Sequence, residues 1–209
     1  MDADWLVKAP KLIKLDEPAV RIRWEPQETI TKLISAMTLA WMRDVSLFAV
    51  ATGMRESEIL SLTRDRIDMG RCNAWVTADG AKSGYARSVP LNDDAMGVLK
   101  RRLATAKRLI FTRDSGDGNT RIQQIDRRVL ARACKTVKIE DFRFHDFRHT
   151  WASWHVQHGT PLMVLKELGG WETIEMVQKY AHLAPSHIAS HAKTVTFWSQ
   201  QPSEKEKAA

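Results

Sequence analysis

The chain has 209 residues, of which 44% are hydrophobic and 27% charged, enough for one large domain or two small ones with a buried core. Lys and Arg outnumber Asp and Glu by 32 to 25, and the net charge of +7 slightly favours a polyanionic partner such as nucleic acid over a charge that only aids solubility. The sequence has no signal peptide or apolar run of membrane-spanning length, and Cys72 and Cys134 form no CxxC pair, so we expect a reduced, cytoplasmic protein that contacts no membrane.

The N-terminal part of the chain predicts a boundary segment followed by three helices. Residues 1–23 mix charges, prolines and short apolar pieces, which is typical of a linker. Helical spacing of apolar residues begins near Pro26, a residue that suits the first turn of a helix. A second helix is expected over residues 43–52, ended by Gly53, and a third begins directly after it.

The middle of the chain has a different character and predicts a small sheet. Residues 74–77 have the pattern of a short strand, and the glycine-containing stretch after them leads to a second strand at residues 88–91. Together they indicate a small antiparallel hairpin or meander. Asn92 then has the position of a helix cap, with the helix running to about Ala106, and another helix is expected over residues 121–136.

The C-terminal part, residues 145–198, is predicted to be mostly helix. Breaks are expected at residues 159–161, at residues 169–170 and at Pro185, because glycine and proline interrupt helices there. The polar tail, residues 201–209, has the composition of a disordered segment. The fold class predicted for the chain is therefore mainly α with a small antiparallel β-sheet (α+β).

Two short patterns in the first half of the chain contain charged candidates for a functional site. In TGMRESEIL, Arg55 and Glu58 lie three apart and share a face if the segment is helical. In AKSGYARSVPL, Lys82 stands at the start of a tight glycine-containing turn. Each pattern alone has an ordinary explanation, a surface ion pair in the first case and a solvated lysine in the second.

A third pattern, FRFHDFRHTWAS, places His145 and Arg148 on one face of a helix whose other face is apolar. His145 and His149 also have the i, i+4 spacing of metal ligands on a helix. The glutamate that makes such a motif catalytic is replaced by Asp146-Phe147, and the cation of Arg148 would repel a zinc ion. A metal site is therefore the minor alternative.

A fourth pattern, LGGWETIEMVQKYAHL, contains Trp171 and, nine residues later, Tyr180. The chain has only two tyrosines, Tyr85 and Tyr180, so the choice of a tyrosine nucleophile is narrow. Alone, a tyrosine near a helix end is usually a packing residue and GGW is usually a turn.

Taken in order, the four patterns resemble the catalytic domain of the tyrosine recombinases, the phage-integrase type of enzyme. In that family an arginine with a nearby acidic residue, a hairpin lysine, HxxR, a histidine or tryptophan, and a tyrosine nine residues further on follow one another. The matching residues are Arg55 with Glu58, Lys82, His145, Arg148, Trp171 and Tyr180. The match covers residues 24–198. It departs from many members in having tryptophan in place of histidine, although the indole N–H still donates one hydrogen bond.

The resemblance implies the integrase catalytic-core fold over residues 24–200 and site-specific DNA recombination through a 3′-phosphotyrosine on Tyr180. It implies that Arg55, Arg148, His145 and Trp171 surround the phosphate, that Lys82 acts as general acid and that Glu58 supports them. Since the covalent link stores the energy of the broken bond, neither a cofactor nor a metal is expected. Two rival functions are DNA relaxation by a type IB topoisomerase and DNA binding by an inactive regulator, and the second is disfavoured because every expected polar position is filled.

The same resemblance implies double-stranded DNA as the partner and a homotetramer assembled on it. In the family a C-terminal element docks on a neighbouring protomer, and residues 185–198 carry an apolar stripe that suits this role. The stripe suits packing on its own domain equally well, so both alternatives stay open. Because family members usually carry a DNA-clamping domain before the catalytic one, and few residues precede Trp24, we expect the chain to be a fragment.

Overall fold

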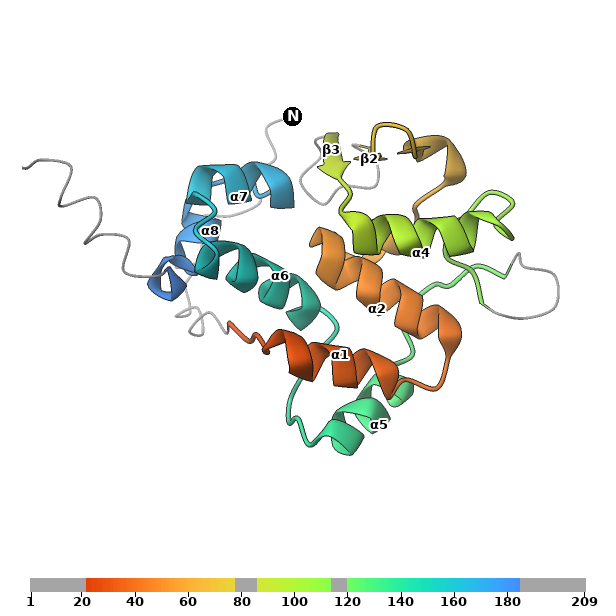
Figure 1. Cartoon of the computed structure of the whole chain (residues 1–209), viewed down its shortest axis with the longest axis horizontal. Coiled ribbons are helices and arrows are strands. Elements are labelled where there is room, and N and C mark those ends of the chain that lie inside the picture. The colour runs from red at the N-terminus through yellow and green to blue at the C-terminus, as the bar shows by residue number, and fades with distance from the viewer. Residues whose placement is uncertain (1–21, 78–85, 114–119, 185–209) are drawn as a thin grey trace, which may run out of the picture.

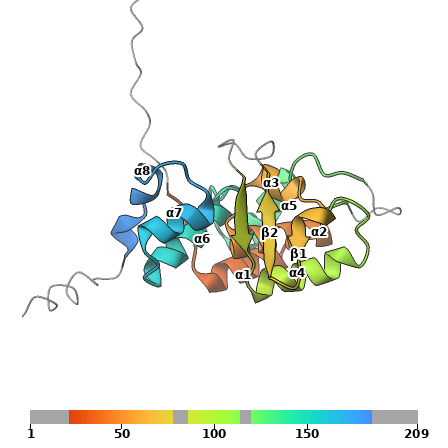
Figure 2. The ribbon, with the colours of Figure 1, turned by 90° about the horizontal axis from the view of Figure 1, so that it is seen from above.

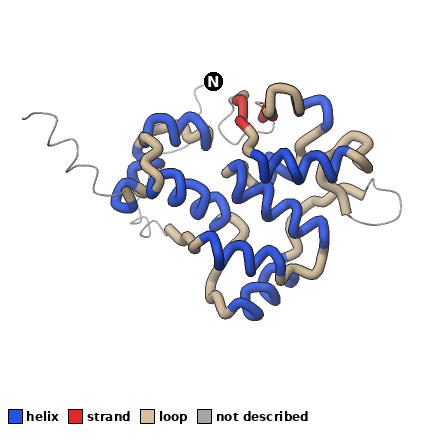
Figure 3. The backbone as a smooth tube through the Cα atoms, in the orientation of Figure 1, coloured by secondary structure: helices blue, strands red, loops and turns tan. Residues whose placement is uncertain are grey.

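A computed structural model of the protein describes residues 22–77, 86–113 and 120–184 (Figure 1). Helices make up most of this part, and the strands form one three-stranded antiparallel sheet (Figure 3). The predicted class, mainly α with a small antiparallel sheet, is thereby confirmed. None of the helices among the described residues is long and apolar enough to cross a membrane.

Three helices follow one another at the N-terminal side, as predicted: α1 (Gln27–Ser35), α2 (Ala40–Thr52) and α3 (Glu56–Leu60). Pro26 immediately precedes α1. Gly53 ends α2 with a φ of 66°, a left-handed conformation that glycine adopts without a Cβ penalty. The prediction of this helix end was correct, whereas α2 begins three residues earlier than predicted.

The sheet follows α3 after a short 3₁₀ turn. These elements are η1 (Arg64–Arg66), β1 (Ile67–Asp68), β2 (Asn73–Val76) and β3 (Arg87–Pro90). The strands lie side by side in the order β1-β2-β3 (Figure 2), with Ala74 paired with Val89 across β2 and β3. The two predicted strands are confirmed with a shift of one residue each. β1 was not predicted, because two residues are too few to show an alternating pattern.

Helix α4 (Asp93–Leu103) follows β3 and confirms the predicted cap. The side chain of Asn92 accepts a hydrogen bond of 3.0 Å from the backbone N–H of Ala95, one of the donors that the first turn leaves unpaired. The helix ends three residues before the predicted Ala106.

Helix α5 (Arg127–Val137) begins later than the predicted residue 121, and that prediction was wrong. Arg121 instead pairs with Thr112 in an isolated β-bridge. The helix starts where the Asp126 side chain accepts the N–H groups of the next turn, so the cap rather than the apolar spacing sets the boundary.

The last helices are α6 (Asp146–Gln157), α7 (Leu162–Gly169), α8 (Glu175–Gln178) and the 3₁₀ turn η3 (Ala181–Leu183). The predicted breaks around Gly159 and Gly170 are confirmed, and both glycines have positive φ. The break at Pro185, the helix expected after it, the C-terminal tail, most of the N-terminal linker and Lys82 lie outside the described residues.

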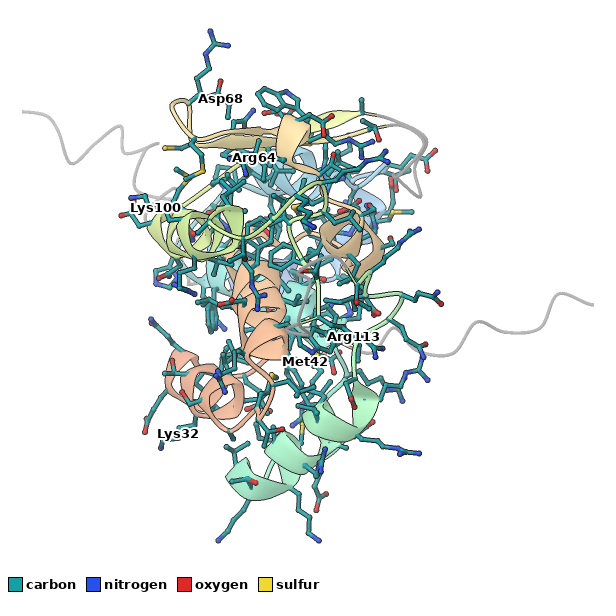
Figure 4. The ribbon with its side chains drawn as sticks, turned by 90° about the vertical axis from the view of Figure 1, so that its right-hand side faces the viewer. Lys32, Met42, Arg64, Asp68, Lys100 and Arg113 are labelled. Carbon is teal, nitrogen blue, oxygen red and sulfur yellow. The ribbon has the colours of Figure 1, made fainter. Side chains whose placement is uncertain are left out.

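Two apolar clusters hold these elements together, and α6 contributes to both. Phe147 packs in the larger cluster, which α2 also fills with residues such as Met42 and Phe48. Figure 4 shows Met42 in the interior and Lys32 at the periphery. Trp151, one turn further along α6, packs in the smaller cluster together with residues of α7 and α8. Helix α6 therefore joins the body around α2 to the C-terminal helices (Figure 1).

A substitution of Gly53 measures how closely α2 and α6 pack. A Cβ atom at this position would collide with the Trp151 ring, and φ is left-handed. We expect Gly53→Ala to lower the free energy of unfolding by about 2–5 kcal/mol, the sum of backbone strain and overpacking. The matched control is Gly159→Ala, where φ is +83° and no described atom lies within 4 Å, so only the strain of about 1–2 kcal/mol applies. Urea denaturation measures both, and equal losses would contradict the close packing.

Candidate active site

Arg55 and Glu58 are brought together at the start of α3. The Glu58 carboxylate accepts a hydrogen bond of 2.9 Å from the backbone N–H of Arg55, as the third residue of a helix does in a capping box. It also accepts Nη1 of Arg55 at 2.8 Å. The side chain of Glu58 is fully buried, whereas that of Arg55 is 19% exposed. The predicted pair is therefore a buried carboxylate that orients a partly exposed guanidinium.

Arg148 lies in the first turn of α6 and is almost fully buried. Its guanidinium donates to the carbonyl of Gly53 at the end of α2 and, at 2.7 Å, to the carbonyl of Gly169 at the end of α7. Burial and the neighbouring cation of Arg55 lower the pKa of Arg148, but a guanidinium remains ionised at neutral pH. The residue thus places a permanent positive charge between three helices.

One cleft of about 600 Å³ brings together four of the predicted residues: Arg55, His145, Arg148 and Trp171. His145 immediately precedes α6 and is exposed, whereas Trp171 follows the left-handed Gly170 at the end of α7. The guanidinium carbon of Arg148 lies 4.1 Å from the centre of the Trp171 ring, a cation–π contact. The cleft therefore presents guanidinium groups, an imidazole and an indole to one volume, which is a chemistry suited to an anion.

Tyr180 lies behind this cleft rather than in its lining. It precedes η3, is fully buried, and has its ring centre 6.0 Å from that of Trp171. Its hydroxyl is 2.6 Å from Nδ1 of His149. The ring of His149 in turn contacts His145 edge to face, with 4.9 Å between the ring centres. A line of contacts thus leads from the phenol through two histidines to the cleft.

Burial raises the pKa of Tyr180, and the charge of Asp146 adds to this, while Arg148 works in the opposite direction. The phenol is therefore neutral in this arrangement. His149 was considered from the sequence only as a metal ligand, and its contact with Tyr180 was not predicted. Among the described residues no three His, Cys, Asp or Glu side chains are grouped so that they could hold a metal ion.

Arg87, at the start of β3, is a further charged member of the site that sequence reasoning missed. Its guanidinium pairs with both oxygens of Glu58, at 2.8 and 2.7 Å. Burial works against ionisation of Glu58, but the hydrogen bonds and charges of Arg87 and then of Arg55 outweigh it and lower the pKa of Glu58 to about 2. The available signal was the arginine in RSVPL, which spacing alone could not connect to Glu58.

Comparison with known proteins gives a consistent result. The sequence profile described as the phage integrase family matches residues 24–187. The chain is similar to the integrase of Salmonella phage P22, with 43% identity over 207 residues, which are 93% of this chain and 53% of that protein. It is also similar to the integrase of Haemophilus phage HP1, with 32% identity over 69% of this chain and 38% of that protein. The chain thus spans about half or less of the length of these relatives.

Solved structures resemble the fold as well. The catalytic domain of bacteriophage HP1 integrase superimposes with a TM-score of 0.64 and 25% identity, over 88% of this chain and 100% of that one. The Tn1549 transposon integrase, in a structure with a circular intermediate DNA, has a TM-score of 0.68 at 16% identity, over 86% of this chain and 67% of that one. The second likeness concerns the fold alone.

The pairing of Glu58 makes stability depend on acid pH. The folded-state pKa of about 2 lies below the ordinary 4.5, so ionised Glu58 stabilises the fold above pH 4.5, and this contribution of about 3 kcal/mol is lost as the pH falls toward 2. We expect Glu58→Gln to be less stable at pH 7 and to lose less stability between pH 5 and pH 2, as measured by urea denaturation at each pH. The control is Glu28→Gln, at an exposed ion pair, which should follow the unmodified chain. Parallel acid profiles of Glu58→Gln and the unmodified chain would contradict the pairing.

Proposed function

The chain belongs to the phage integrase family, and we propose that it cuts and rejoins DNA at specific sites through a 3′-phosphotyrosine link to Tyr180. One observation carries this proposal: Arg55, His145, Arg148 and Trp171 line a single cleft, and Tyr180 packs against Trp171 directly behind it. The similarity to phage integrases supports integration or excision of a phage or prophage as the biological setting.

The cleft suits the transition state of phosphoryl transfer. Negative charge accumulates there on the non-bridging oxygens, and planar guanidinium groups present pairs of donors to such oxygens. We assign this role to Arg55 and Arg148, with His145 and Trp171 as further donors. Donors that are already oriented need no rearrangement as the charge develops, which is usually the largest contribution to catalysis.

The nucleophile must leave its buried position to react. The hydroxyl of Tyr180 bonds to His149 and the side chain is fully enclosed, so the phenol oxygen has to turn toward the phosphate in the cleft when DNA is bound. A phenol is a weak nucleophile even at its ordinary pKa of about 10, so Tyr180, whose pKa burial raises, needs a base. We propose that His149 accepts the phenolic proton first and that His145, in contact with it, assists at the cleft.

The remaining steps conserve the energy of the broken bond. The phenol oxygen bonds to phosphorus, the bond from phosphorus to the 5′ oxygen breaks, and Lys82 supplies the proton that this oxygen takes up. The assignment of Lys82 rests on the family resemblance, because this residue lies outside the described part of the chain. Attack by a second 5′ hydroxyl reverses the chemistry and releases Tyr180, so neither a metal nor a cofactor takes part.

We further propose that double-stranded DNA is the partner and that four protomers assemble on two sites. The family resemblance supports this assembly, as does the net charge of +7, which attracts a polyanion. Residues 185–198 are proposed to dock on a neighbouring protomer through their apolar stripe. We also propose that the protein acts in the cytoplasm, where the DNA of a bacterial host lies.

Tyr180→Phe tests the nucleophile. The substitution removes the attacking oxygen but keeps the ring, so covalent capture of DNA should disappear. Folding should lose only the hydrogen bond to His149, about 0.5–1.5 kcal/mol. The measurement is a denaturing gel of protein incubated with a nicked duplex that carries the attachment site, from which the released strand cannot return.

Tyr85→Phe is the matched control, because Tyr85 is the other tyrosine of the chain. It should retain the covalent band. A band that persists in Tyr180→Phe and vanishes in Tyr85→Phe would reverse the assignment of the nucleophile.

A further inference from the structure

Arg87 occupies an unusual position for a charged residue of a DNA-binding site. Its side chain is only 11% exposed, and it is not among the residues that line the cleft. The guanidinium makes a planar, two-pronged pair with the carboxylate of Glu58. Such a geometry fixes both partners in one orientation. Arg87 therefore acts within the protein rather than on a ligand in the cleft.

The carboxylate of Glu58 is shared between two arginines, and all its acceptor positions are used. Oε1 accepts Nη1 of Arg55 and Nη1 of Arg87, both at 2.8 Å. Oε2 accepts the backbone N–H of Arg55 at 2.9 Å and Nη2 of Arg87 at 2.7 Å. Because Arg87 donates one hydrogen bond to each oxygen of Glu58, Arg55 can donate to the carboxylate with only one of its guanidinium nitrogens. Its second terminal nitrogen, Nη2, donates to the carbonyl of Gly170 at 3.3 Å.

The charge balance of the site depends on the pairing of the Glu58 carboxylate with both Arg55 and Arg87. An isolated Arg55–Glu58 pair would be neutral and would offer little to a phosphate. With Arg87 added, two guanidinium groups share one carboxylate, and Arg55 keeps a net positive charge beside Arg148. Since the effective dielectric constant of a buried site is low, the charge of one such group changes anion binding appreciably.

Arg87 also supports the turn that carries Trp171. A Cβ atom on Gly170 would collide with Cδ, Nε and Cζ of Arg87, so the arginine stem packs directly on the glycine backbone. The carbonyl of Gly169 accepts a hydrogen bond from Arg148, and the carbonyl of Gly170 accepts one from Arg55. One side chain thus touches both Glu58 and the turn that contacts the other two arginines.

We propose that Arg87 is a positioning residue of this site: it holds Glu58 so that Arg55 faces the cleft with its charge available for the phosphate group. The proposal rests on the function proposed above, because it assigns Arg87 to the same anion-binding cleft. Arg87 acts through Glu58 and has no contact with the substrate of its own.

The test measures binding of inorganic phosphate to the full 209-residue chain by NMR titration of the His145 ring, which is exposed at the cleft. The variants are Arg87→Met, which keeps the stem and removes the charge, Arg87→Lys, Glu58→Gln, and the double variant of Arg87→Met with Glu58→Gln. Arg71→Met is the matched control, because the side chain of Arg71 is 84% exposed. Thermal unfolding of each variant shows whether it is folded at the titration temperature.

Arg87→Met should weaken phosphate binding about tenfold, because Arg55 then faces the carboxylate of Glu58 alone and keeps less positive charge for the phosphate, and Arg87→Lys should restore part of it. Glu58→Gln should itself weaken binding, because Arg55 loses the carboxylate that orients it. Adding Arg87→Met to Glu58→Gln should weaken binding by less than about threefold further, because Arg87 then has no carboxylate to hold. Arg71→Met should leave binding unchanged.

Two results would overturn the proposal. A further loss of about tenfold on adding Arg87→Met to Glu58→Gln would show that Arg87 does not act through Glu58. Unchanged binding in Arg87→Met, or no measurable phosphate binding by the unmodified chain, would remove the role altogether. Should Arg87→Met fail to fold, Arg87→Lys with and without Glu58→Gln makes the same comparison. Phosphate binding requires no DNA cleavage, so this pattern in a chain that never captures DNA would support Arg87 while contradicting the proposed recombinase activity.

Discussion

Backbone carbonyl groups at the ends of two helices hold the arginines of the cleft, and the other contacts of the site depend on this arrangement. The last carbonyls of a helix have no partner within it and carry the negative end of the helix dipole. Arg148 donates to the carbonyls of Gly53 and Gly169, which end α2 and α7, and Arg55 donates to that of Gly170. Because a carbonyl bears only a partial charge, these bonds orient Arg148 without neutralising it, whereas Arg55 also pairs with the carboxylate of Glu58. The cleft thus keeps the positive charge that a phosphate requires.

This arrangement also explains the two consecutive glycines before Trp171. A Cβ atom on Gly169 would collide with the Trp171 ring, and one on Gly170 would collide with the stem of Arg87. Gly170 in addition has a φ of +63°, which side chains rarely adopt. The absence of side chains lets an indole, two carbonyls and the Arg87 stem meet in one turn. A pair of residues that looks like an ordinary loop in the sequence is therefore required by packing on both sides.

The parts of the fold that could be predicted are those with a local physical cause. Asn92 caps its helix and Gly53 ends its helix because the side chain, or its absence, acts on the nearest backbone groups. The start of α5 was misjudged because Ile122 and Ile125 are buried at a spacing that also suits a helix, although the chain there is not helical. The backbone there is tied instead to a distant segment, since the N–H of Ile125 donates to Glu56, a contact that local spacing does not reveal.

The site likewise contains some features that the sequence predicts and others that depend on contacts between distant residues. The order of the short patterns revealed the family resemblance, and the resemblance implied that Arg55, His145, Arg148 and Trp171 surround one phosphate. These four residues line one cleft. The pairing of Glu58 with a residue 29 positions away, and of His149 with one 31 positions away, depends on tertiary packing. These distant contacts have a common consequence. They keep the charges of the cleft oriented while the phenol of Tyr180 stays neutral and shielded from water. In the proposed reaction the phosphate-binding groups would therefore be in place before the attacking oxygen is exposed.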